Sequence, residues 1–215
     1  MEKSCSFPKV VLFDLLTALL DSWTVWNRAA GSEAQGRVWR AEYLRLTYGC
    51  GAYAPYEELV AAAARHVGLE AGTVQKLEQL WPELLVWSGV QEALDAIEGR
   101  AQLGIVTNCS KRLGRLAADR LRTRWDCVVT AEEAGYYKPD PRPFRFALKV
   151  MGVKAEEAAF VAGSGYDLIG TYAVGLRTYW HNRVGLARPD AAPPADFESR
   201  NLDQLLPWLE NAQCR

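Results

Sequence analysis

Short apolar runs, each suited to a buried strand, alternate with segments of helical period along most of the chain. The run from Val10 to Phe13 is followed by comparable runs at 103–106, 128–129, 159–162 and 177–180. Segments with helical spacing lie at 90–97, 111–121, 142–150, 166–174 and 202–209. A run of consecutive apolar residues favours a strand that is buried on both faces. Strands that alternate with helices at this spacing predict an α/β fold with a parallel, helix-covered sheet.

The stretch between the first strand and residue 90 breaks this alternation and has a helical pattern. Ser32-Glu33-Ala34-Gln35 is typical of a capping box, which would open a helix that runs to about Tyr48. Pro55 suits the start of a second helix, to about Val67, and a third spans about 73–80. We therefore expect a Rossmann-like parallel sheet core formed by residues 1–17 and 90–215, with residues 18–89 inserted as a helical cap domain.

Composition and charge argue against several classes of function. The chain has 215 residues and a net charge of −1, which gives no electrostatic reason to bind nucleic acid or an anionic membrane. No apolar run approaches the roughly 20 residues of a membrane span. The five cysteines are widely spaced and form no Cys-x-x-Cys pair, which argues against a disulfide framework or a zinc site. We expect a cytoplasmic protein with no nucleic-acid or membrane partner, and the sequence leaves open whether it forms a homodimer.

Polar residues follow several of the predicted strands. Asp14 ends the first strand, Thr107 and Asn108 end the next buried one, and Asp167 comes shortly after the run at 159–162. In parallel α/β sheets, ligands bind at the carboxyl ends of the strands. Each residue also has a purely structural interpretation: Asp14, Thr107 and Asn108 suit turns, and Asp167 suits a helix N-cap. Their common placement at strand ends favours a shared site.

The order of these segments resembles the haloacid dehalogenase superfamily. Phe13-Asp14-Leu15-Leu16-Thr17 is similar to its first motif and Val106-Thr107-Asn108 to its second. Lys138-Pro139-Asp140-Pro141 resembles the third motif, and the segment from Phe160 to Asp167 resembles the fourth. The four segments occur in the family's order and span most of the chain. The resemblance implies a hydrolase whose nucleophile is an aspartate.

Two departures from the family's phosphatases bear on the chemistry. Those enzymes carry a second Asp two residues after the nucleophile, where this chain has Leu16, and another Asp where it has Gly163. Mg²⁺ needs oxygen ligands, usually carboxylates with phosphate. The proton donor for a departing alkoxide is also missing. We therefore expect no metal and no cofactor, and the sequence resembles the metal-independent branch, which attacks carbon through an aspartyl ester.

The resemblance implies a role for each candidate residue. Asp14 is the nucleophile, Lys138 holds it ionised, Thr107 places a hydroxyl beside it, and Asp167 orients Lys138 or the hydrolytic water. Arg40, after Trp39, matches the arginine that contacts a departing halide or the substrate carboxylate. The remaining substrate-binding candidates are Asn108, Ser164, Leu16, Tyr48 and Trp23. The structural alternatives are a surface Arg40 whose stem packs on Trp39 and a solvated loop Lys138.

Further departures bear on the identity of the substrate. Ala18 stands where the family turn has a hydroxyl, and Phe144 where the family tends to have Tyr. The segments Leu15-Leu16-Thr17-Ala18 and Asp21-Ser22-Trp23 look more like azetidine-2-carboxylate hydrolases, which open a strained ring bearing an amine and a carboxylate. Aromatic rings beside the site would suit a small cation.

We expect a metal-independent hydrolase that cleaves a C–N or C–halide bond of a small carboxylic acid, with an ordinary L-2-haloacid dehalogenase as the alternative. A phosphatase with a rebuilt metal site and a non-catalytic binding protein are the other readings.

Overall fold

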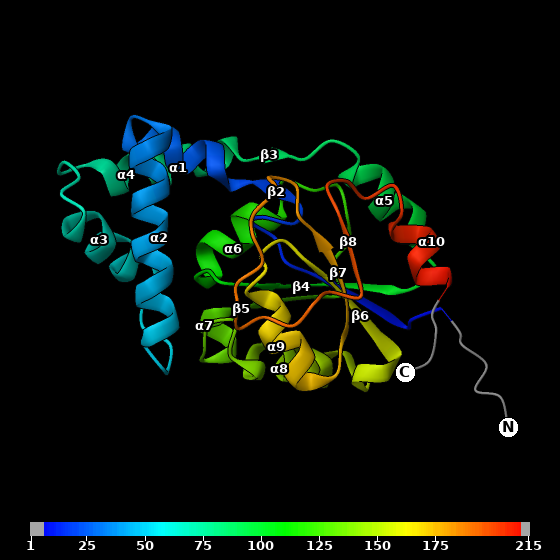
Figure 1. Ribbon diagram of the computed structural model, residues 1–215. Helices are drawn as coiled ribbons and strands as arrows, with labels where there is room; N and C mark the ends of the chain where they lie inside the picture. The colour runs from blue at the N-terminus through cyan, green and yellow to red at the C-terminus, as the bar shows by residue number, and fades with distance from the viewer. Residues whose placement is uncertain (1–6, 212–215) are drawn as a thin grey trace, which may run out of the picture.

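A six-stranded parallel sheet forms the centre of the molecule, here a computed structural model that describes residues 7–211 (Figure 1). Its strand order is β5-β4-β1-β6-β7-β8. The strands are β1 (Val10–Phe13), β4 (Gln102–Thr107), β5 (Cys127–Thr130), β6 (Ala158–Ala162), β7 (Arg177–His181) and β8 (Phe197–Ser199). Phe13 of β1 lies opposite Ile105 of β4 and Val161 of β6. The chain leaves β1 toward β4 and β5, then returns past it to β6, so β1 borders the point where the strand order reverses. Such a point is where open α/β sheets bind ligands.

Helices cover both faces of this sheet, as the apolar runs predict. Along β1, Val11 and Phe13 belong to one apolar cluster, whereas Val10 and Leu12 belong to another. The first cluster includes residues of α5 (Val90–Ile97), α6 (Lys111–Ala118) and α10 (Leu205–Glu210). The second includes residues of α8 (Pro141–Met151) and α9 (Asp167–Val174). Consecutive strand residues point to opposite faces, so a strand without polar positions must be buried on both sides.

Four helices between β1 and α5 gather beside the sheet, at the left of Figure 1. They are α1 (Ser22–Ala30), α2 (Glu33–Gly49), α3 (Tyr56–His66) and α4 (Thr73–Leu80), and we call them the helical group. The chain enters and leaves this group through a short antiparallel pair, β2 (Leu20–Asp21) and β3 (Leu85–Val86). Apolar residues of the group share the first cluster with the sheet. The two parts therefore have one continuous core.

The predicted helices and strands agree with the structure except at several ends and in several short elements. Ser32 accepts a hydrogen bond from Gln35 N, and α2, α3 and α4 lie where the pattern places them. The predicted helix at 111–121 ends at Ala118, and the terminal helix begins at Leu205 rather than at residue 202. The pattern missed α1, β2, β3 and β8. It also missed α7 (Ala131–Ala134) and two short 3-10 turns, Trp81–Glu83 and Ala155–Glu157. Within the described residues, no helix has the length and apolar character needed to cross a bilayer.

Candidate active site

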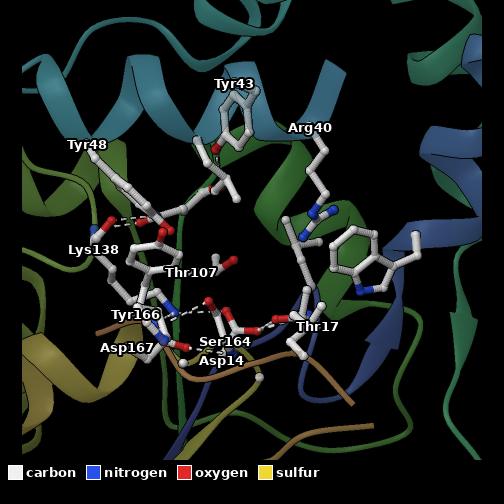
Figure 2. A pocket seen from close by; sticks show the side chains of 18 of the residues that line it. Asp14, Thr17, Arg40, Tyr43, Tyr48, Thr107, Lys138, Ser164, Tyr166 and Asp167 are labelled. Atoms are coloured by element: carbon white, nitrogen blue, oxygen red, sulfur yellow. Dashed lines mark hydrogen bonds and ion pairs between the residues drawn. The ribbon is translucent and has the colours of Figure 1, made fainter. Parts of the chain in front are cut away.

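A cavity of about 120 Å³ lies at the carboxyl end of β1, beneath the helical group (Figure 2). Every candidate site residue predicted from the sequence lines it: Asp14, Leu16, Trp23, Arg40, Tyr48, Thr107, Asn108, Lys138, Ser164 and Asp167. Asp14 and Asp167 come from the sheet side, whereas Arg40, Tyr43 and Tyr48 come from α2. Parallel strand ends and an overlying helix thus bring segments far apart in sequence into one site.

Asp14 is held by four hydrogen bonds. Its Oδ2 atom accepts from Thr17 N at 2.9 Å, Thr17 Oγ1 at 2.6 Å and Ala18 N at 3.0 Å. Its Oδ1 atom accepts from Lys138 Nζ at 2.8 Å. Burial opposes ionisation of Asp14, but the charge of Lys138 and the hydrogen bonds from Lys138 and Thr17 outweigh it, and the pKa of Asp14 lies below its usual value. Asp14 is therefore an ionised carboxylate in a fixed orientation.

Thr17 is a site residue that the sequence reasoning missed. The family motif places a hydroxyl at position 18, where this chain has Ala18. The structure shows that Thr17, one residue earlier, supplies a hydroxyl to Asp14 Oδ2. A hydroxyl three residues after a strand-end Asp suits a side chain that folds back onto the carboxylate. The spacing between Asp14 and Thr17 could therefore have identified Thr17 from the sequence.

Lys138 joins two carboxylates that come from different strand ends. Its Nζ atom lies 2.8 Å from Asp14 Oδ1 and 3.0 Å from Asp167 Oδ1, and its side chain is only 4% exposed. Burial would lower its pKa, but the charges of Asp14 and Asp167 outweigh burial and raise it. Lys138 therefore stays a cation and cannot serve as a base, and the solvated-loop interpretation is wrong.

Asp167 differs from Asp14 in its electrostatic surroundings. Burial, with the charge of Asp14 adding to it, raises the pKa of Asp167 to about 6 despite the contact with Lys138. Its Oδ2 atom accepts from Ser164 N at 3.3 Å, and α9 begins at Asp167 itself. Two carboxylates whose pKa values are pushed apart are suited to different roles in catalysis. Asp14 suits a nucleophile, and Asp167 suits a proton acceptor near neutral pH.

Arg40 is buried in the wall of the cavity rather than on the surface. It is 8% exposed, and its guanidinium lies 4.2 Å from the centroid of the Trp23 ring. Its Nη1 atom donates to Ser22 Oγ at 3.1 Å, whereas its buried Nε atom has no hydrogen-bond partner within residues 7–211. Burial lowers the pKa of Arg40, but a guanidinium remains charged in proteins. An unsatisfied buried donor on a cation is suited to an anionic group of a ligand.

The end of β4 supplies two polar residues, Thr107 and Asn108, with different surroundings. Thr107 is 1% exposed, and its Oγ1 atom has no partner within the described part of the chain. Asn108 instead pairs with the backbone of Lys138: its Nδ2 atom donates to Lys138 O at 2.8 Å, and its Oδ1 atom accepts from Lys138 N at 2.7 Å. Asn108 therefore positions Lys138 in this structure.

The site does not fit the Mg²⁺ ion of the family's phosphatases. Both of its carboxylates bind the Lys138 ammonium, and Leu16 is apolar. A Cβ atom at Gly163 would lie 2.5 Å from the carbonyl carbon of Thr17, so no carboxylate can be carried there without moving the turn. Across residues 7–211, no three His, Cys, Asp or Glu side chains gather as a metal site.

Comparison with known proteins gives the family. Residues 8–171 match the family described as haloacid dehalogenase-like hydrolase. The chain belongs to this hydrolase family. Several named proteins are similar to this chain over most of their own length. An (S)-2-haloacid dehalogenase 4A from Burkholderia cepacia is 27% identical over 94% of each chain. Phosphoglycolate phosphatase 1 from Pseudomonas aeruginosa is 27% identical over 95% of this chain and 81% of its own.

Structural comparison agrees with the sequence relationship. A dehalogenase of known crystal structure superposes with a TM-score of 0.83 and is 26% identical, over 95% of this chain and 98% of that one. The α/β core with its parallel sheet is therefore the fold of this hydrolase family, as the motifs predicted.

Proposed function

We propose that this hydrolase displaces a leaving group from carbon 2 of a small carboxylic acid through an ester on Asp14. The observation that carries this proposal is the arrangement Asp14–Lys138–Asp167, in which both carboxylates pair with the Lys138 ammonium. The (S)-2-haloacid dehalogenases similar to this chain support a reaction at the carbon next to the carboxylate.

In the first step, Asp14 Oδ1 attacks carbon 2, and the electron pair of the broken bond leaves with the departing atom. Oδ1 is the suitable nucleophile because it accepts one hydrogen bond, whereas Oδ2 accepts three. Arg40 and the Thr107 hydroxyl would hold the substrate carboxylate, because both present buried polar atoms without a partner in the described chain. Alignment of a fixed nucleophile behind the reacting carbon contributes up to about 7–11 kcal/mol in favourable cases.

In the second step, water adds to the carbonyl carbon of the Asp14 ester and gives a proton to Asp167. Negative charge then builds on Oδ2, which faces two backbone N–H groups and the Thr17 hydroxyl. Three donors aimed at a developing oxyanion form an arrangement suited to ester hydrolysis. Collapse breaks the bond between the carbonyl carbon and the former Oδ1, which stays on the product and takes the proton of the added hydroxyl. A 2-hydroxy acid leaves, the Asp14 carboxylate is restored, and Asp167 releases its proton to solvent.

The charges of the cavity favour a zwitterionic substrate such as azetidine-2-carboxylate. Its charged lining residues are two acids, Asp14 and Asp167, and two cations, Arg40 and Lys138. A zwitterion adds no net charge to this buried site, whereas a 2-haloacid leaves one negative charge to compensate. Attack at carbon 2 opens the strained ring, and the ring nitrogen leaves as an amine that stays attached to the product. The second candidate is 2-haloacid dehalogenation, which the named relatives favour.

Heavy-oxygen labelling tests the ester. In ¹⁸O water, the first turnover should give unlabelled product, because the new oxygen comes from Asp14, and repeated turnover should label the protein. Turnover should also be unchanged by EDTA. Labelled product in the first turnover, or an EDTA-sensitive rate restored by Mg²⁺, would reject the proposal and favour the phosphatase alternative.

An Arg40→Ala variant separates the two substrates. If a halide leaves and Arg40 contacts it instead of the substrate carboxylate, Arg40 stabilises charge that develops only in the transition state, and kcat should fall. If a ring ammonium leaves, Arg40 holds the carboxylate equally throughout the reaction, and KM should rise instead. Arg45→Ala is a matched control, because Arg45 lies on the same helix but pairs with Glu42 at the surface. With azetidine-2-carboxylate, we expect Arg40→Ala to raise KM. Steady halide release from a 2-haloacid by the wild-type enzyme, together with a collapsed kcat in Arg40→Ala, would indicate an ordinary dehalogenase.

We also propose that the helical group acts as a cap domain over this site, with boundaries near residues 18 and 89. Its α2 supplies Arg40 and Tyr48 to the cavity, which is the contribution expected of a cap.

A further inference from the structure

Trp87 and His181 contact the turn that follows Asp14, on the side away from the cavity. The proposed reaction uses neither side chain. We call residues 17–18 the nucleophile's turn. Trp87 Nε1 donates to the carbonyl oxygen of Thr17 at 3.2 Å. His181 Nδ1 lies 2.7 Å from the carbonyl oxygen of Ala18, and because a carbonyl only accepts, the ring nitrogen must donate. His181 is fully buried. Neither residue lines the cavity, so neither touches a substrate there.

The contact of Trp87 reaches Asp14 through a single peptide unit. The carbonyl of Thr17 and the N–H of Ala18 are the two ends of one planar peptide. That N–H donates to Asp14 Oδ2 at 3.0 Å. The indole N–H, the peptide and the carboxylate therefore form a continuous hydrogen-bonded chain, in which each bond polarises the next.

The contact of His181 fixes the following peptide. Its carbonyl belongs to Ala18 and its N–H to Leu19, which donates to Leu15 O at 3.2 Å. Two consecutive peptides of the turn are thus held at both ends. Rotation of the Thr17–Ala18 peptide would turn the Ala18 N–H away from Asp14, and the bonds to His181 and Leu15 hold the next peptide, to which it is joined.

Both contacts originate in parts of the fold that are themselves fixed. Trp87 follows β3. Its backbone N–H donates to Leu19 O at 3.0 Å, which extends the β2–β3 pair. His181 ends β7, opposite Ser199 of β8. The nucleophile's turn is therefore held from two places: by Trp87, where the chain returns from the helical group, and by His181, at the end of β7.

We propose that Trp87 and His181 are positioning residues that keep the Thr17–Ala18 turn aimed at Asp14 Oδ2 for hydrolysis of the ester. This rests on the proposed ester mechanism. The two chemical steps respond differently to this turn. Negative charge on Oδ2 is present in the free carboxylate, falls when the ester forms, and returns when water adds. Loosening the turn should therefore spare ester formation and slow ester hydrolysis, so that the ester accumulates.

A Trp87→Phe variant tests the proposal, because phenylalanine keeps an aromatic ring and removes the indole N–H. The matched control is Trp81→Phe, which loses an equivalent bond, Nε1 to Leu113 O at 2.9 Å, away from the cavity. Each variant would be mixed with L-azetidine-2-carboxylate or (S)-2-chloropropionate and quenched in acid during turnover. Intact-protein mass spectrometry would then measure the fraction that carries the ester. We expect kcat to fall about 10-fold in Trp87→Phe, less than the 10²–10³ of losing an oxyanion donor outright. Ester should become the main species in Trp87→Phe and stay low in Trp81→Phe.

His181 is tested with a pair of variants, since a buried residue can be needed for folding. His181→Asn keeps an N–H donor near the position of Nδ1, whereas His181→Leu removes it. Ester accumulation in the leucine variant that is relieved in the asparagine variant would support the proposal. A purely structural role would lower thermal stability in both without accumulating ester.

The outcomes separate this inference from the proposed function. A Trp87→Phe variant that behaves like Trp81→Phe, in a wild-type background that does form the ester, would overturn the inference alone. A wild-type enzyme that turns over either compound with no ester and no ¹⁸O in Asp14 would overturn the proposed function, and this inference with it.

Discussion

Opposite protonation tendencies in neighbouring carboxylates give this site its chemical character. Asp14 and Asp167 contact the same ammonium, yet the pKa of Asp14 is lowered whereas that of Asp167 is raised to about 6. Asp14 accepts three further hydrogen bonds from its own turn, whereas Asp167 accepts one from Ser164 N. Hydrogen bonds to an ionised carboxylate favour its charged form. The turn after β1 therefore decides which carboxylate is the nucleophile.

The Thr17 hydroxyl should be needed for turnover. Thr17→Val removes one of three donors to Oδ2 at almost constant volume, and loss of one such donor typically costs about 10²–10³ in kcat. Thr17→Ser keeps the hydroxyl and should retain most activity. Steady-state kinetics with the compound that the wild-type enzyme turns over measures both. A valine variant with a wild-type kcat would show that the hydroxyl is only structural.

Asp167 should make ester hydrolysis dependent on pH near its pKa. The carboxylate accepts a proton only when ionised. The charge of Asp14 helps to raise the pKa of Asp167 to about 6, and because the Asp14 ester is neutral, the pKa of Asp167 in the ester should lie below that value. Single-turnover decay of the ester should therefore be constant from pH 6 to 8 and slow in more acidic solution. Asp167→Asn should hold the ester at every pH. Decay that is as fast at pH 4 as at pH 7, in protein that remains folded, would exclude Asp167 as the base.

At the residue scale, the sequence predicts the members of the site better than their contacts. Strand-end polar residues and family motifs indicate lining residues such as Asp14, Lys138 and Arg40. Thr17, Tyr43 and Tyr166 also line the cavity and were not predicted. The contact of Asn108 with the Lys138 backbone was not predictable, because it depends on how two loops meet. Thr17 was missed because the family motif places its hydroxyl one residue later.

At the element scale, long elements were predictable and short ones were not. The apolar period of α2 to α4 and the apolar runs of β1, β4 and β6 carry enough residues to specify their type. α1 is rich in Trp, Thr and Val, which are weak helix formers, so its pattern is masked despite its Asp21 N-cap. β8 has three residues, partly exposed, and depends on its pairing with β7. Such elements form through tertiary contacts rather than local preference.

The loop after β6 packs closely against the Thr17–Ala18 turn, so Gly163 in this loop should not tolerate any side chain. A Cβ atom there would overlap the backbone of Thr17 and Ala18, so Gly163→Ala should cost about 1–3 kcal/mol and displace the donors to Asp14. Gly49→Ala is a matched control, because Gly49 is exposed on α2 and a Cβ there meets nothing within 4 Å. It should be neutral or stabilising by up to about 1 kcal/mol. Thermal unfolding and activity together test both, and an active, stable Gly163→Ala enzyme would show that the turn adapts.

At the scale of the whole molecule, the site depends on the helical group and the sheet staying in register. Arg40 comes from one and Asp14 from the other, and polar bonds cross between them. Tyr137 Oη donates to Ala54 O at 2.8 Å, Tyr43 Oη to Asn108 O at 3.3 Å, and Trp81 Nε1 to Leu113 O at 2.9 Å. These bonds lie beside the apolar cluster that both parts share. The sequence predicts two parts, but this shared core is visible only in the structure.

Such a shared core should make unfolding a single cooperative event. Three of the eight tryptophans, Trp26, Trp39 and Trp81, are fully buried in or beside the helical group, so unfolding of this group alone would change part of the tryptophan fluorescence, whereas far-UV circular dichroism reports the helices of the entire chain. Separation would expose apolar residues of both parts, and the buried donors that cross between them would lose their partners, at about 1–3 kcal/mol for each unsatisfied group. Urea titrations followed by fluorescence and by circular dichroism should therefore give coincident transitions. A Tyr137→Phe variant, which removes one crossing bond, should lower the common midpoint while keeping the two curves together. A fluorescence transition at lower urea than the dichroism transition would instead mean that the helical group unfolds first, as an independent domain.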